Sequence, residues 1–276
     1  MIWLQFLIFN LIFYVDIMYY QFQSSKYTLA LVIVLLLIMI IINPMIDAVM
    51  YGGAQVATSV LAPACFGYAS KPPAVTPNIE EAKKLMAEAG YPDGFPLTIT
   101  VNEEQVRVEL CNVMQSQLKE IGIDLKIDVV EQSTYVDICG RGAHELCFQN
   151  WTASTADADY TYYPLYHSKC YGSQGGRAFG EIPGMDAIVE KAKGEPDSAK
   201  RIELYQQAED LIQEYAVNMS LVWTDLNVGV TDNVENFELM SNTYHKLYQV
   251  KVYHSLLTLF FHNYYQLDIL LSLRKH

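Results

Sequence analysis

The sequence predicts an α/β fold in which helices cover a mostly parallel sheet. Three short stretches alternate apolar and polar residues, as half-buried strands do, and two longer stretches between them carry apolar residues at helical spacing. The strands are expected at 97–101, 123–129 and 145–149, and the helices at 106–121 and 133–139. Alternating strands and helices with short connections favour right-handed crossovers and a parallel sheet.

A further helix is expected before the first strand. Asn78 is a suitable N-cap, Glu81 completes a capping box, and Gly90 ends the helix. Its apolar face consists of Ile79, Ala82, Leu85, Met86 and Ala89.

The second helix is expected to end at Gly122, because glycine adopts the left-handed conformation that commonly follows a helix. Further along, helices are predicted at 183–193 and 198–215, the second capped by Asp197. Short strands are predicted at 220–224 and 227–230.

The composition divides the chain into a core and two flanks. All 15 glycines lie between Gly52 and Gly229. Residues 1–46 and 251–276 hold two acidic and four basic residues, which leaves 29 acidic and 14 basic residues in 47–250, a net charge of −15. An acidic core without a basic cluster argues against nucleic-acid binding, which needs positive charge to meet phosphates.

The flanks, residues 1–46 and 254–276, are apolar and expected to be helical. Residues 27–46 carry no charge and are about long enough to span a bilayer, so they are a transmembrane candidate. An uncleaved signal-like segment is one alternative. Translation outside the true reading frame of an AT-rich gene is another, and it would also explain the tail at 254–276.

The five cysteines form no evident disulfide framework, because their number is odd and their spacing wide. His144, Cys147, His167 and Cys170 form two His-x-x-Cys pairs, which resemble a four-ligand zinc set. The favoured interpretation is an ordinary buried thiol at Cys147, inside an apolar strand pattern, and we expect no metal or cofactor.

The stretch "NWTASTADADYTYYPLYHS" follows the third predicted strand. In open α/β sheets, ligands bind beyond the carboxyl ends of the strands, so this stretch is expected at the mouth of a site. Trp151 and Tyr160 could stack on a ligand. Asp157 and Asp159 could contact a ligand or cap the helix expected near Tyr160.

The core resembles the second half of the family 5 extracellular solute-binding proteins, the peptide- and nickel-binding receptors of ABC importers. The resemblance covers residues 47–252 and rests on the following stretches, in family order: "NIEEAKKLMAEAGYPDGFPLTITV", "MQSQLKEIGIDLKIDVVE", "NWTASTADADYTYYPLYHS", "MDAIVEKAKGEPDSAKRIELYQQAEDLIQEYA" and "YHKLYQVKVY". It implies that residues 47–253 form one lobe of a two-lobed periplasmic-binding-protein-like receptor, which closes on its ligand and delivers it to permease subunits.

The resemblance also implies site residues. In peptide-binding members an aspartate three residues after the strand-ending tryptophan pairs with the ligand's amino group, and here that position is Ser154, which puts amine recognition in doubt. Arg177 matches a basic position near the cleft, where it could receive a carboxylate. The expected ligand-binding residues are Trp151, Ser154, Asp157, Asp159, Tyr160 and Arg177.

The resemblance implies an extracytoplasmic protein that binds oligopeptides or other small solutes. The transmembrane candidate in the first flank could anchor it to the membrane. Family receptors run to roughly twice this core length, so the opposing lobe is expected to be missing and binding by the chain alone to be weak. Two alternatives stay open. One is a zinc-dependent hydrolase that uses the two His-x-x-Cys pairs with Asp157 as general base. The other is a membrane-tethered fragment that binds no ligand.

Overall fold

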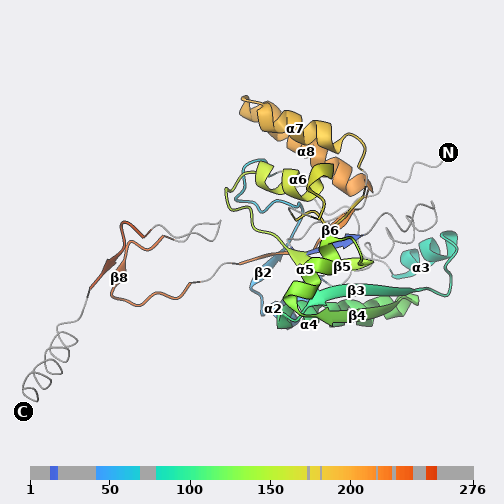
Figure 1. The fold of residues 1–276 in the computed structure, drawn as a ribbon. Helices are drawn as coiled ribbons and strands as arrows, with labels where there is room; N and C mark the ends of the chain where they lie inside the picture. The colour runs from blue at the N-terminus through green and yellow to red at the C-terminus, as the bar shows by residue number, and fades with distance from the viewer. Residues whose placement is uncertain are drawn as a thin grey trace, which may run out of the picture. The chain divides into compact units, whose positions relative to one another are not determined.

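The computed structural model divides the chain into two compact units, Met1–Asp225 and Leu226–His276. The residues that it describes are 13–17, 42–68, 79–172, 175–180, 182–215, 217–225, 228–238 and 247–253. Within the first unit, Figure 1 shows a sheet together with a group of three helices, α6, α7 and α8.

A five-stranded sheet has the strand order β4-β3-β5-β1-β6. Strand β3 pairs in parallel with β4 and β5, whereas β1 pairs antiparallel with both β5 and β6. Four of the five strands therefore run in one direction, which confirms the mostly parallel sheet. The strands are β1 (Phe13–Ile17), β3 (Pro96–Asn102), β4 (Asp124–Val130), β5 (Leu146–Asn150) and β6 (Asn218–Ser220).

Strand β1 is the main departure from the expected architecture. It belongs to residues 1–46, which the sequence suggested as an apolar helical flank, yet it pairs with the sheet on both sides. Val15 faces Phe148 of β5 and Met219 of β6 in the register. Aromatic and β-branched residues suit a strand, and two neighbouring strands satisfy its backbone groups.

One face of the sheet carries the larger apolar core. Leu97, Ile99 and Val101 of β3 and Leu146 and Phe148 of β5 are buried there, as strand alternation requires. The helices on this face are α2 (Ile42–Met50), α3 (Ile79–Glu88) and α4 (Gln105–Leu118), followed by a 3₁₀ turn, η3 (Lys119–Ile121). Gly122 has φ 86°, which confirms its predicted role as the left-handed residue after the helix.

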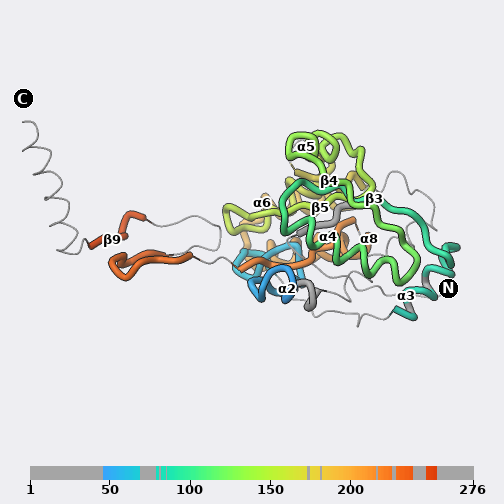
Figure 2. The backbone as a smooth tube through the Cα atoms, turned by 90° about the horizontal axis from the view of Figure 1, so that it is seen from below, coloured from blue at the N-terminus to red at the C-terminus, as the bar shows by residue number. Residues whose placement is uncertain are grey.

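Helix α5 (Gln132–Gly140) lies on the opposite face, and Figure 2 shows the strands between it and α4. Its Tyr135 hydroxyl donates a hydrogen bond of 2.7 Å to the Phe148 carbonyl oxygen of β5. Tyr135 and Cys139 pack there against Cys147, whose side chain points away from the larger core.

A second core lies among α6 (Asp159–Tyr166), α7 (Met185–Gly194) and α8 (Ser198–Tyr215), with the 3₁₀ turn η4 (Ser168–Cys170) after α6. Tyr162 stacks on Tyr205, with ring centroids 5.4 Å apart and planes 11° apart. Asp197 caps α8 as predicted, because its Oδ1 accepts from the backbone nitrogens of Ala199 and Lys200.

The strand expected at 220–224 is split between two sheets. Strand β6 ends at Ser220, and β7 (Val222–Thr224) pairs antiparallel with β2 (Ala54–Val56). The strand expected at 227–230 is wrong for the described residues 228–230, where Val228 and Val230 are exposed and pair with no strand. In the second unit, β8 (Val234–Glu235) pairs antiparallel with β9 (Lys251–Val252).

Within the described part of the chain, no helix combines the length and apolarity that crossing a membrane requires. Residues 27–41 of the transmembrane candidate lie outside the described residues, and residues 42–46 form the start of α2. The tail at 254–276 also lies outside them.

Candidate functional site

Polar side chains gather at the carboxyl edge of the sheet. Arg107, near the start of α4, is 8% exposed and donates from Nη2 to the Asn150 Oδ1 at the end of β5, over 2.7 Å. Its Nε lies 2.8 Å from Glu104 Oε2. Asn102, at the end of β3, donates from Nδ2 to Gln132 Oε1 at the start of α5, over 2.7 Å. These contacts hold the carboxyl ends of β3 and β5, and the loop that begins at Trp151 follows β5.

These edge residues were not predicted from the sequence. Asn102 and Asn150 each end a strand, which is a signal that could have singled them out. Arg107 does not end a strand. It lies next to the apolar positions of α4, where a charged residue is expected on the exposed face of the helix.

Two of the predicted ligand contacts, Trp151 and Tyr160, form one aromatic pair. Their ring centroids lie 5.8 Å apart with an interplanar angle of 33°. The Trp151 Nε1 donates to the Tyr160 carbonyl oxygen over 3.1 Å, which holds the indole against the first turn of α6. Trp151 is half-buried, while Tyr160 is 42% exposed. The pair presents aromatic surface beside the end of β5.

A glycine backbone packs on this indole. Gly175 has φ 119°, and a Cβ added to it would lie 2.9 Å from Trp151 Cζ3, so a larger residue would displace the ring. The Gln149 Nε2 donates to the Gly175 carbonyl oxygen over 3.3 Å. Strand β5 therefore holds the backbone at Gly175 against Trp151.

Asp157 is bound by Arg201 of α8. The Arg201 Nη1 donates to Oδ2 and Nη2 donates to Oδ1, each over 2.8 Å. The Asp157 Oδ1 also accepts from the Asp159 backbone nitrogen over 2.9 Å, which supports the capping alternative for this residue. Burial alone would lower the pKa of Arg201, but its hydrogen bond to Asp157 and the nearby Tyr205 raise the pKa above its usual value. The ligand contact expected of Asp157 stays a prediction.

Asp159 begins α6, where a carboxylate suits the helix dipole. Its Oδ1 is buried and makes no hydrogen bond to any described residue. Burial raises the pKa of Tyr205 to about 12, and the charges of Asp159 and Asp157 add to that rise. Ser154, the position of the aspartate in peptide-binding members, is half-buried in the loop between Trp151 and Asp157.

Arg177 points toward a different group of residues. Its Nη1 donates to the Gly172 carbonyl oxygen over 2.6 Å, and its charge is close enough to help lower the pKa of His144. The structure thus brings Trp151 and Tyr160 together, joins Asp157 to Arg201, and places the Arg177 guanidinium near His144.

The two predicted His-x-x-Cys pairs do not form one cluster among the described residues. His144 and Cys147 lie with Cys139, and this group does not include His167 or Cys170. His167 Nε2 instead lies 3.1 Å from Glu190 Oε1, and its Nδ1 accepts from the Lys169 backbone nitrogen. The four-ligand zinc set, which the sequence supports only as a disfavoured alternative, does not form among the described residues, because His167 faces α7.

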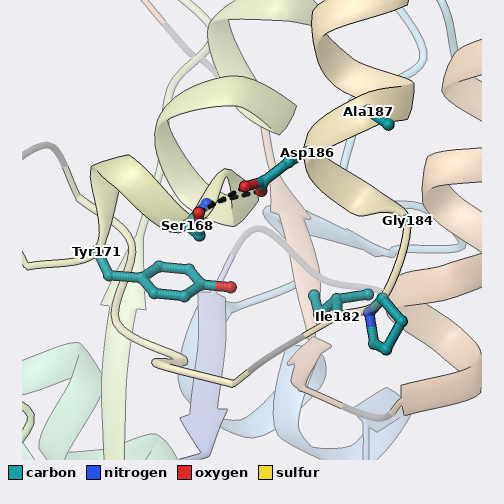
Figure 3. Close-up of a pocket in the computed structure, with 7 residues that line it drawn as sticks. Ser168, Tyr171, Ile182, Gly184, Asp186 and Ala187 are labelled. Carbon is teal, nitrogen blue, oxygen red and sulfur yellow. Dashed lines mark hydrogen bonds between the residues drawn. The ribbon is translucent and has the colours of Figure 1, made fainter.

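A pocket of about 400 Å³ lies between η4 and the start of α7 (Figure 3). Ser168 donates to the Asp186 carboxylate from its backbone nitrogen, over 2.9 Å, and from its hydroxyl, over 2.5 Å. Figure 3 shows this contact on one side and the ring of Tyr171 on another, and Pro183 also lines the pocket. The pocket contains none of the six predicted site residues, and no motif in the sequence pointed to it.

The fold and the edge site define one lobe of a periplasmic-binding-protein-like fold. Residues 43–173 match the family described as bacterial extracellular solute-binding proteins, family 5 Middle. Over these residues, just under half of the chain, the sequence is similar to the family 5 extracellular solute-binding proteins.

Curated relatives agree over most of the chain. Glutathione-binding protein GsiB of Escherichia coli (strain K12) is 27% identical over 200 residues, which are 70% of this chain and 39% of that protein. A probable di/tripeptide-binding protein 5 of Pseudomonas aeruginosa (strain UCBPP-PA14) is 28% identical over 183 residues, 64% of this chain and 34% of that protein. The chain thus matches well under half the length of these relatives.

Solved structures show the same fold. HbpA2 from Haemophilus parasuis aligns with a TM-score of 0.75 and 24% identity, over 90% of this chain and 49% of that chain. The periplasmic binding protein DppA from Helicobacter pylori, in complex with peptide STSA, aligns with a TM-score of 0.70 and 25% identity, over 87% and 46%. The one-lobe fold predicted from the sequence is confirmed.

Proposed function

We propose that this chain supplies one lobe of the substrate-binding component of an ABC importer, which binds peptides or similar small solutes outside the cytoplasm and delivers them to permease subunits. The observation that carries the proposal is the aromatic pair of Trp151 and Tyr160 beside the end of β5, in a chain of the family 5 fold. The names of relatives, a glutathione-binding protein and a probable di/tripeptide-binding protein, support peptides as the ligand class.

We assign direct ligand contact to the exposed part of this loop. Tyr160 and the half-buried Trp151 offer aromatic surface, and Ser154 lies between them in the chain. Asp157 holds the loop in place through its hydrogen bonds to Arg201, and Asp159 begins α6. Asp157 could also accept a hydrogen bond from a ligand, with an oxygen lone pair that Arg201 does not use. Arg177 donates from Nη1 to the Gly172 carbonyl oxygen and would meet a ligand carboxylate with its other N–H groups.

The role proposed is binding without catalysis. Both relatives described above are named for what they bind. The hydrolase alternative loses its geometric basis, since its four metal ligands are not together and its general base, Asp157, is engaged by Arg201. A membrane-tethered fragment that binds nothing remains the competing hypothesis, and a binding measurement separates it from the receptor lobe.

Equilibrium dialysis of the whole chain against labelled glutathione, dipeptides and tripeptides tests the proposal. A single lobe buries only part of a ligand, so we expect saturable binding with a dissociation constant of about 1 mM. Trp151→Ala should abolish it, whereas Trp223→Phe, in the core far along the chain, should not. Binding that fails to saturate for every peptide, or equal binding of a disaccharide, would contradict a peptide receptor lobe.

A further inference from the structure

A compact group of potential metal ligands lies beneath the second face of the sheet. Cys139 comes from the last turn of α5, His144 from the turn that follows, and Cys147 from β5. The two Sγ atoms and a His144 ring nitrogen all lie within 4.8 Å of one another. Both cysteines are 0% exposed and His144 is 2% exposed. Three elements therefore deliver two thiols and one imidazole to a single buried point.

His144 is the unusual member of this group. Neither ring nitrogen makes a hydrogen bond of ordinary geometry to any described residue, although the ring is almost fully buried and the Arg177 backbone makes a less well aligned contact with it. A buried polar group without a partner is costly, and native structures rarely keep one without a reason. The ring packs edge-on against Phe179, with centroids 6.3 Å apart, so packing fixes the plane of the ring.

A cation bound between the three side chains would satisfy the imidazole. Thiolate and imidazole together select borderline-soft and soft cations, and Zn²⁺ is bound by cysteine and histidine at distances of about 2.0–2.3 Å. In a tetrahedral site two such ligand atoms lie about 3.7 Å apart, so side-chain adjustments of about 1 Å would bring these atoms into place. We propose that Cys139, His144 and Cys147 form a three-ligand site for a thiophilic cation of the Zn²⁺ class.

The charges of the site balance on binding. Two thiols release two protons when they become thiolates, and their two negative charges offset the two positive charges of Zn²⁺. The imidazole binds a cation in its neutral form, through the lone pair of one ring nitrogen. The Arg177 guanidinium lies near His144, outside the ligand set, and donates from Nη1 to the Gly172 carbonyl oxygen.

The site would have a structural role in the fold. Beyond the hydrogen bond from Tyr135 to the Phe148 carbonyl, α5 is held to β5 by the small apolar group of Tyr135, Cys139 and Cys147. A bound cation would add a link between α5, the following turn and β5. This predicts that the cation stabilises the fold, independently of any peptide.

Metal titration of the whole chain tests the site directly. The protein is reduced with a phosphine, stripped with a chelator and titrated with Zn²⁺ against a chromogenic competitor. We expect one Zn²⁺ per chain and an increase in the thermal unfolding midpoint that the chelator reverses. Co²⁺ in place of Zn²⁺ should show thiolate-to-cobalt charge transfer. Absence of that band in the unaltered protein, or no stoichiometric binding, overturns the proposal.

Substitutions locate the site. Zn²⁺ binding should weaken by at least about tenfold in each of Cys139→Ser, His144→Ala and Cys147→Ser. His144→Cys should bind Zn²⁺ more tightly than His144→Ala does, because it supplies a third thiolate. Cys170→Ser and Cys111→Ser are matched controls, because both thiols are buried outside the group. Equal losses in these controls would contradict the site. The site would also be contradicted if mass spectrometry of protein isolated without reductant found a disulfide between Cys139 and Cys147 in preference to the metal complex.

Discussion

The Asp157 carboxylate receives two parallel hydrogen bonds from the Arg201 guanidinium, each with a nitrogen-to-oxygen distance of 2.8 Å. The two residues are far apart in the sequence, and the pair ties the loop after β5 to helix α8. Because Asp157 also binds the first turn of α6, the pair sets the position from which Trp151 and Tyr160 extend. The candidate site is thus supported by a side chain outside it.

Arg201→Lys should destabilise the protein. Lysine keeps the charge but cannot make two parallel hydrogen bonds to a carboxylate, and the pair is mostly shielded from solvent, with side chains 21% and 30% exposed. We expect a loss of about 1–2 kcal/mol in the free energy of unfolding, measured with urea. Arg141→Lys is the control, since its pair with Asp137 lies on an exposed helix face, and it should change little. Equal effects of the two substitutions would show that Arg201 does not fix the loop.

Gly94→Ala should be more harmful than Gly90→Ala. Both glycines have positive φ, so alanine is strained at either position. At Gly90 a Cβ meets nothing within 4 Å, whereas at Gly94 it would overlap the Gly122 backbone. We expect losses of about 1 kcal/mol for Gly90→Ala and about 3 kcal/mol for Gly94→Ala, from urea unfolding. Similar values would mean that the two turns do not approach as closely as the structure shows.

Stability should decrease in acid partly through Asp186. Partial burial alone would raise the pKa of Asp186, but hydrogen bonds from Ser168 and the charges of His167 and Lys169 hold it below 3.8. The unfolded chain therefore takes up this proton first as the pH falls. The stabilisation is complete well above pH 3.8 and is lost as the pH falls through the lower pKa of the folded state.

Thermal unfolding between neutral pH and about pH 3 measures this contribution. Asp186→Asn should unfold at a lower temperature at neutral pH, and its unfolding midpoint should depend less on pH in the acid range. Asp124→Asn, at an exposed position on β4, is the matched control and should keep the steeper dependence. A pH profile unchanged by Asp186→Asn would contradict the contact with Ser168.

Ser154→Asp should increase affinity for peptides with a free amino terminus. The resemblance places Ser154 where peptide-binding relatives carry an aspartate, and a carboxylate there would pair with the ligand's ammonium group. We expect about a tenfold gain for a dipeptide and none for its N-acetylated form, by calorimetry or dialysis. Thr155→Asp adds the same charge at the next, exposed position and should give no such gain. A gain for the acetylated peptide as well would rule out pairing with the amino group.

Sequence periodicity was enough to predict the helices and the parallel strands. Apolar spacing and capping residues such as Asp197 are local, and the structure confirms them at α3, α4, β3 and β4. The antiparallel β1 was missed, because its five residues lie in an apolar stretch and their role depends on pairing with β5 and β6. Local patterns carry no information about such distant partners.

The candidate site shows the same limit. Its expected place after the third strand of the core followed from the order of elements. Trp151 and Tyr160 lie together there, a contact that the sequence did not predict. The Asp157 to Arg201 pair spans 44 positions and could not be read from spacing. Cys139 was not predicted as a neighbour of His144 and Cys147, because the repeated His-x-x-Cys spacing suggested His167 and Cys170 instead.

The most direct test of the central claim is an NMR titration of the tryptophan indole N–H signals with a dipeptide. Trp151→Phe assigns the signal at the candidate site, and Trp223, in the larger core, provides an internal reference. We predict that the Trp151 signal shifts in a saturable manner while the Trp223 signal does not. If the Trp151 signal stays fixed up to about 10 mM dipeptide, or the two signals shift alike, the loop after β5 is not the ligand site.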